Sequence, residues 1–154
     1  MIKKTLFLSI LLFGIISTMG INAQEGQKIY KSDEVDVKPS FPGGEKAYRT
    51  FIRKEVKFPI EARAQNKKGV VYISYLILAD GSIQQVKFAK FMDWIPDADG
   101  KYHESKDKIE PVKSIVDEAI RVIKKFPKHE PGQKNGIPVS VLMETKLTFF
   151  AAGK

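Results

Sequence analysis

The chain of 154 residues contains no cysteine, and this absence excludes disulfide cross-links, thiolate zinc sites and thiol catalysis. It also excludes a lipid-modified N-terminal cysteine. Acidic residues are in the minority, with 18 Asp and Glu against 26 Lys and Arg, so the formal net charge is +8. That charge favours an acidic partner or surface without naming one. The composition, 43% hydrophobic and 29% charged, is otherwise typical of one globular domain.

Long apolar runs are also missing. The longest run covers residues 6–16, which is 11 residues, whereas a bilayer span needs about 20. Lys3 and Lys4 precede this run, and Ala23 follows it as the small residue of a cleavage site. We therefore interpret residues 1–23 as a signal peptide and residues 24–38 as a short polar lead-in. The alternative is an uncleaved N-terminus that anchors the chain in the inner membrane.

The hydrophobic pattern predicts an α+β fold. Apolar residues recur at helical spacing, and β-branched or alternating residues mark strands. The expected helices cover residues 45–54, 60–65 and 111–126, and the expected strands cover residues 70–78, 83–91 and 139–149. Asp80-Gly81 predicts a hairpin between the first two strands. The result is a small antiparallel three-stranded sheet with two or three helices packed on one face, and a long irregular loop at residues 92–110.

Catalytic and metal-binding patterns are absent from the sequence. His103 and His129 have no adjacent nucleophile or carboxylate in a recognised pattern, and both are expected on the surface. The segment Asp97-Ala98-Asp99-Gly100 resembles the middle of a calcium loop, but Ile95 and Lys106 would then occupy the first and twelfth ligand positions. We expect no enzyme activity, no catalytic residue, no metal and no cofactor.

The basic excess does not predict nucleic-acid binding. Lys124, Lys125 and Lys128 gather with Arg121 near the end of the last helix, where they complement the helix dipole. A nucleic-acid site normally shows a concentrated basic face with stacking aromatics or a recognisable module. We interpret these lysines as a solvated helix end.

Six short motifs nevertheless follow one another in a set order. They are Pro39-Ser40-Phe41-Pro42-Gly43-Gly44-Glu45; Phe58-Pro59 with Ala62; Gly69-Val70-Val71 with Asp80-Gly81-Ser82; Asp117 to Ile123 with Phe126-Pro127; Pro131-Gly132 with Asn135-Gly136-Ile137-Pro138-Val139; and Leu147-Thr148-Phe149. In this order they resemble the TonB C-terminal domain from about Pro39 to Phe149. Residues 39–154 are therefore expected to form a TonB C-terminal-like domain.

The resemblance implies a periplasmic protein of a Gram-negative bacterium that takes part in transport across the outer membrane. Domains of this family grip the N-terminal box peptide of a TonB-dependent outer-membrane receptor by strand addition. Carried onto this sequence, the partner-binding strand consists of Val139, Ser140, Val141, Leu142, Met143, Glu144, Thr145, Lys146, Leu147, Thr148 and Phe149. The same strand can also complete the core, because its side chains face inward while its edge stays open.

The sequence departs from the family pattern in three places. His129 stands where the family usually has Trp after the helix-ending Pro, and the 92–110 excursion is longer than usual. The N-terminal apolar run also lacks the functional His of an energy transducer, and no long Pro-rich spacer follows it.

These observations favour a stand-alone periplasmic protein-binding module and leave alternatives open. One is a membrane-anchored energy transducer that couples the proton motive force to receptor-mediated uptake. Another is a homodimer formed through the edge strand. A third, of a different class, is a periplasmic small-ligand or cell-wall binder that uses Trp94 and Tyr102, although Trp94 equally suits a cover for the core.

Overall fold

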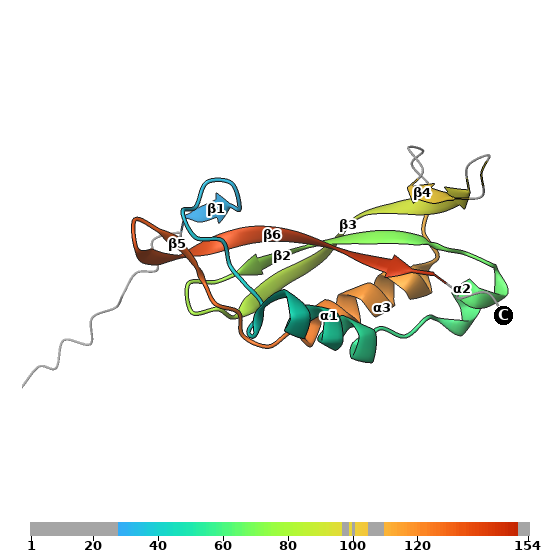
Figure 1. The fold of residues 1–154 in the computed structure, drawn as a ribbon, viewed down its shortest axis with the longest axis horizontal. Helices are drawn as coiled ribbons and strands as arrows, with labels where there is room; N and C mark the ends of the chain where they lie inside the picture. The colour runs from blue at the N-terminus through green and yellow to red at the C-terminus, as the bar shows by residue number, and fades with distance from the viewer. Residues whose placement is uncertain (1–27, 97–98, 100, 105–109, 151–154) are drawn as a thin grey trace, which may run out of the picture.

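A computed structural model describes residues 28–96, 99, 101–104 and 110–150 (Figure 1). Its elements are β1 (Ile29–Lys31), α1 (Gly44–Glu55), α2 (Ile60–Ala64), β2 (Gly69–Ile77), β3 (Ile83–Pro96), β4 (Tyr102–Glu104), α3 (Lys113–Lys124), β5 (Gly132–Lys134) and β6 (Ile137–Phe149). The α+β prediction and the three predicted helices are confirmed. The predicted signal peptide, residues 1–23, lies outside the described residues. None of the helices in the described ranges is long and apolar enough to cross a bilayer.

The sheet has the order β1-β6-β2-β3-β4, and β5 pairs with β6 off this path. Its centre is the predicted antiparallel set of β6, β2 and β3. The prediction of only three strands is wrong, because β1, β4 and β5 extend the sheet, and β1 runs parallel to β6. Each added strand has three residues, too few to show the alternation that reveals a strand in a sequence. Residues 29–31, expected within the lead-in, form β1.

The core lies between the sheet and the helices, which cover one face of it (Figure 1). Alternate residues of β2 face the helices, and α3 presents an apolar stripe to them. The fully buried members of these two elements are Val71, Ile73, Ile77, Ile115, Ala119, Val122 and Ile123. Since Val70 and Leu76 on the opposite face of β2 are also buried, the interpretation of this strand as central is confirmed.

The predicted irregular loop at 92–110 is contradicted over its first part. Strand β3 continues to Pro96 and turns back into β4, which pairs Trp94 with Glu104. The Glu104 carboxylate accepts hydrogen bonds from the Tyr72 hydroxyl, at 2.7 Å, and from Lys146 Nζ, at 3.1 Å. Tyr72 and Lys146 lie on the face away from the helices, so the β3–β4 hairpin curls over that face, as Figure 1 shows.

The predicted turn at Asp80-Gly81 is confirmed and is locked to a distant segment. Gly81 has a φ of 81°, in the left-handed region that favours glycine. Its carbonyl accepts a hydrogen bond from the His129 amide at 2.9 Å, and Lys128 Nζ lies 3.1 Å from an Asp80 carboxylate oxygen. A Cβ at residue 81 would lie 2.0 Å from the His129 carbonyl oxygen. Only glycine therefore permits this close contact.

Gly81→Ala should lower the free energy of unfolding by about 3 kcal/mol or more. The alanine would be strained by the left-handed backbone conformation, and its Cβ would also collide with the His129 carbonyl oxygen. Gly136→Ala is the matched control: its φ is 74°, and a Cβ there meets nothing within 4 Å. The control should lose about 1 kcal/mol from strain alone. Urea unfolding of the two variants measures the difference, and equal losses would contradict the proposed lock.

Candidate peptide-binding edge and its pocket

Strand β6 is paired along most of one edge and over only three residues of the other. On the first edge it runs beside β2 in an unbroken register from Val141 opposite Ile77 to Phe149 opposite Gly69. On the second edge, β1 pairs with residues 140–142. Strand β5 pairs with residues 137–139, which precede the first residue paired with β2. In the described part of the chain, nothing pairs with the second edge of residues 143–149. The backbone donors and acceptors there are open to another strand.

The structure thus divides the predicted partner-binding strand in two. Val139 is paired with β5 and Ser140 with β1, whereas Val141 and Leu142 are paired with β1 on one edge and β2 on the other. The second edge is open at Met143, Glu144, Thr145, Lys146, Leu147, Thr148 and Phe149. A peptide that leaves β1 and β5 in place can therefore pair with the second group alone.

The side chains of the open part alternate between the two faces of the sheet. Leu147 and Phe149 are buried under the helices, whereas Glu144, Lys146 and Thr148 are exposed on the other face. An added strand would therefore contact mainly backbone along the edge itself. Any selectivity for the side chains of the partner would have to come from residues next to the edge.

Strand β3 offers a second open edge, but that edge is less regular. Among the described residues, β4 covers only its last three positions. Its pairing with β2 shifts register twice, and Gln85 adopts a φ of 50°. Lys87 and Lys90 are exposed along it. Register breaks and lysines are devices that keep edges from pairing, so the regular β6 edge is the better docking strand.

A pocket of about 260 Å³ opens beside the first residues of the unpaired edge. Its walls come from the turn before α1, the first half of α1, the strands β2 and β6, and the segment after α3 that carries His129. The lining includes Phe41, Tyr48, Tyr75, His129, Met143 and Thr145. Because Met143 and Thr145 belong to the open part of β6, the pocket and the edge form one continuous site.

Edge-to-face aromatic packing holds the pocket walls in place. The ring centroid of Phe41 lies 5.7 Å from that of Tyr48, 5.6 Å from that of Phe126 and 5.3 Å from that of His129. Rings at such distances and angles attract one another beyond simple area burial. Phe41 therefore joins the turn, α1 and the segment after α3 at one point.

The polar atoms of the pocket are only partly satisfied. The hydroxyls of Tyr48 and Thr145 share a hydrogen bond of 2.9 Å. His129 donates from Nδ1 to the Pro127 carbonyl at 3.0 Å, which leaves Nε2 as an acceptor in the neutral ring. Burial lowers the pKa of His129 and raises the pKa values of Tyr48 and Tyr75. All three side chains are therefore uncharged at neutral pH.

The expectation that His129 lies on the surface is wrong: it is 8% exposed. Phe126, three residues earlier, and Phe41, far away in the sequence, pack against its ring. Sequence reasoning also missed Tyr75 as a site residue. Its one signal was its position between the inward-facing Ile73 and Ile77 in an alternating strand.

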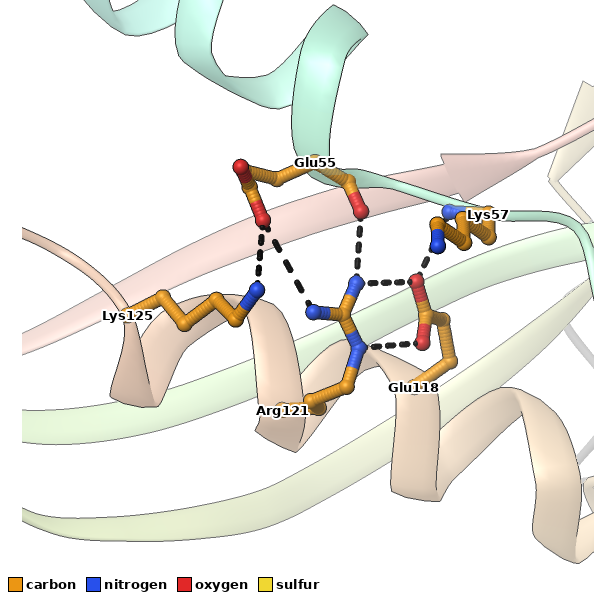
Figure 2. Close-up of polar contacts among 5 residues, drawn as sticks. All are labelled: Glu55, Lys57, Glu118, Arg121 and Lys125. Atoms are coloured by element: carbon orange, nitrogen blue, oxygen red, sulfur yellow. Dashed lines mark hydrogen bonds and ion pairs between the residues drawn. The ribbon is translucent and has the colours of Figure 1, made fainter.

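An ion-pair network fixes the far end of α1, the helix that forms one wall of the site (Figure 2). Arg121 on α3 forms a bidentate pair with Glu118, with nitrogen–oxygen distances of 2.7 and 2.8 Å, and also donates to the Glu55 carbonyl at 2.6 Å. Lys125 Nζ donates to the Glu55 carboxylate at 3.0 Å. The amide of Lys57 donates to Glu118 at 2.7 Å. Because α1 has no fully buried residue, these bonds matter for its position.

Other predicted site features lie elsewhere. Trp94 packs on Phe150 at 5.7 Å, and its indole nitrogen is buried without a hydrogen-bond partner, so its ring is a cover rather than an open stacking surface. Within the described ranges, no group of three or more His, Asp or Glu side chains could hold a metal ion. Most of the Asp97–Gly100 segment lies outside the described residues.

No protein-family model matches the chain, and no curated protein matches it. A solved structure, the NMR solution structure of the Helicobacter pylori TonB C-terminal domain, is similar at 18% sequence identity and a TM-score of 0.37. The alignment covers 72% of this chain and 89% of that chain. A likeness of this extent assigns no family, partner or activity.

His129 predicts a pH dependence of stability. Its folded-state pKa lies below the usual 6.5, so the unfolded chain takes up the proton first as the pH falls. Stability should therefore decrease as the pH falls below about 6.5 and level off below the folded pKa. Urea unfolding of the wild type and of His129→Gln between pH 5 and 8 measures the slope. Identical profiles for the two proteins would contradict the prediction.

Arg121→Lys should lower the free energy of unfolding by about 1 kcal/mol and speed amide exchange at Val56, because a lysine cannot keep the bidentate geometry. Arg49→Lys is the control, since Arg49 forms one exposed pair with Glu45 within α1. That change should be nearly neutral. Equal amide exchange in both variants would show that the network does not anchor α1.

Proposed function

We propose that the chain is an exported protein-binding module that accepts an extended segment of a partner protein as an additional strand along residues 143–149 of β6. One observation carries this proposal: the second edge of β6 is regular, is covered by β1 at residues 140–142, and beyond them is left open by every described segment. Backbone pairing would give affinity there without a particular partner sequence.

The partner class follows from the sequence. The motifs between Pro39 and Phe149 resemble a domain family that binds the N-terminal box peptide of TonB-dependent outer-membrane receptors. The features of residues 1–23 indicate export, so such receptors would be accessible to the chain in the periplasm. The proposed role is a protein interaction in transport across the outer membrane, with no enzymatic step.

The geometry supports entry of a partner without unfolding. Strand β1 ends at Lys31, opposite Leu142, and it lies on the same edge that the partner would extend. A partner strand that begins beside Met143 would continue this line and keep the antiparallel pairing with β2 intact on the other side. Seven residues of edge match the usual length of a strand.

Cysteine cross-linking can map this pairing, because the chain has no cysteine of its own. Glu144→Cys and Thr148→Cys place thiols on exposed positions of the open edge strand. The probes are synthetic peptides that copy the N-terminal segments of outer-membrane receptors from the same organism, each with one cysteine moved along the sequence. Directly opposed Cβ atoms in paired strands are close enough for a disulfide.

We expect disulfides at alternate peptide positions, which is the period of a strand, and a shift of four positions between the two variants. Lys87→Cys on the open edge of β3 is the matched control and should not cross-link. Cross-linking without periodicity, or preference for Lys87→Cys, would contradict the proposal. A disulfide-linked dimer of Glu144→Cys without peptide would indicate pairing between two copies of the chain instead.

A further inference from the structure

We propose that the pocket beside Met143 and Thr145 receives one aromatic side chain of the added strand, with tyrosine preferred over phenylalanine. This inference rests on the proposed strand addition and states what the partner must carry. It assigns side-chain selectivity to a site in which the edge itself supplies only backbone contacts.

The position of the pocket fits a side chain of the incoming strand. Met143 and Thr145 project toward the helices, and the pocket lies on that side of the edge. Side chains of an added strand alternate between the two faces, so every second one would point to the helix side. The pocket lies where the open edge begins, immediately after the last residue paired with β1.

The size and lining of the pocket fit an aromatic ring. A dry cavity of about 150 Å³ is enough to bind benzene, and this pocket measures about 260 Å³. The rings of Phe41, Tyr48 and His129 form its walls and already pack edge to face. A further ring can join this arrangement with the same favourable geometry.

Two buried polar side chains favour a hydroxyl on that ring. Tyr75 is 4% exposed and His129 is 8% exposed, and both line the pocket. In the described part of the chain, the Tyr75 hydroxyl has no hydrogen-bond partner, and His129 uses Nδ1 but not Nε2. The Tyr75 hydroxyl offers a donor and His129 Nε2 an acceptor. A tyrosine hydroxyl can accept from the first and donate to the second.

A lysine side chain is the main competitor, because aromatic pockets also attract cations. The carboxylates at the rim belong to Glu45 and Glu144. Glu45 is paired with Arg49 at 2.8 Å, and Glu144 is exposed on the opposite face of β6, so neither supplies a buried negative charge. The polar atoms inside the pocket are neutral hydrogen-bonding groups, which favours a phenol over an ammonium group.

The first test uses the intact protein and side-chain analogues. Titration with p-cresol, toluene and n-butylamine, which stand for tyrosine, phenylalanine and lysine, is followed by NMR at the Met143 methyl and the His129 ring. We expect saturable shifts with p-cresol, binding at least threefold weaker with toluene, and none with n-butylamine. Tyr75→Phe should remove the difference between p-cresol and toluene. Equal or stronger binding of n-butylamine, or no saturable shift with p-cresol, would overturn the inference.

The second test uses the receptor peptides mapped by cross-linking. At the position that lies over the pocket, we expect a tyrosine guest to bind about tenfold more tightly than a serine guest, from burial of the ring. Ser40→Phe should fill the pocket and remove this preference. Val37→Phe is the control, because Val37 pairs with Gln133 as Ser40 pairs with Glu130, but it does not line the pocket.

The two proposals fail in different ways. Peptides that neither bind nor cross-link to Glu144→Cys would refute strand addition, and the inference with it. Peptides that cross-link with strand periodicity but bind equally with tyrosine, serine or lysine at the guest position would leave strand addition intact and refute the aromatic pocket. A preference that survives in Ser40→Phe would place the selecting site elsewhere.

Discussion

Burial of β2 on both edges and both faces is the constraint on which the other elements depend. A strand with apolar residues at nearly every position must have a neighbour on each side and a cover above and below. Strands β3 and β6 supply the neighbours, α3 covers one face, and the β3–β4 hairpin curls over the other. Because β6 is recruited to pair with β2, its own second edge becomes the border of the central sheet.

Strand β1 closes that border over residues 140–142. Strand β5 turns directly into β6 through Asn135-Gly136, and β1 lies beside the next three residues. Beyond Leu142 no described segment reaches the edge, and α1 lies to the helix side of it rather than across it. The pocket follows from this arrangement, since Phe41 and the α1 side chains pack against the core below the edge without covering it.

Long periodic segments made much of this fold predictable. The stripe of α3, the alternation of β6 and the Asp80-Gly81 turn all carry local signals that the structure confirms. The short strands β1 and β5 carry none, because three residues cannot show a period. The pairing of β1 depends on β6, which lies far away in the sequence, whereas β5 is joined to β6 by the turn at Asn135-Gly136. The extension of β3 past Phe91 was hidden because the chain there does not alternate.

The candidate site was predictable as a strand but not as a pocket. The pattern of residues 139–149 indicates an edge strand, yet it cannot show which half is already paired. Tyr75, His129 and Phe41 meet where the turn at Gly81 hydrogen-bonds to the backbone of His129 and Ser40 pairs with Glu130. The contact of His129 with Phe41 joins residues far apart in the sequence and leaves no local signal, and a histidine is usually interpreted as a surface residue.

An open edge is a hazard as well as a binding surface, and the chemistry of β6 reflects both. Exposed Glu144 and Lys146 alternate on its outer face, where charges oppose stacking with an apolar strand. In an antiparallel pair of β6 strands from two copies of the chain, Glu144 of one copy could lie opposite Lys146 of the other. These opposite charges would tolerate the pairing. Charge alone therefore does not separate a partner from a second copy. The pocket can make that distinction, because residues 143–149 of β6 include no tyrosine that could enter the pocket of a second copy.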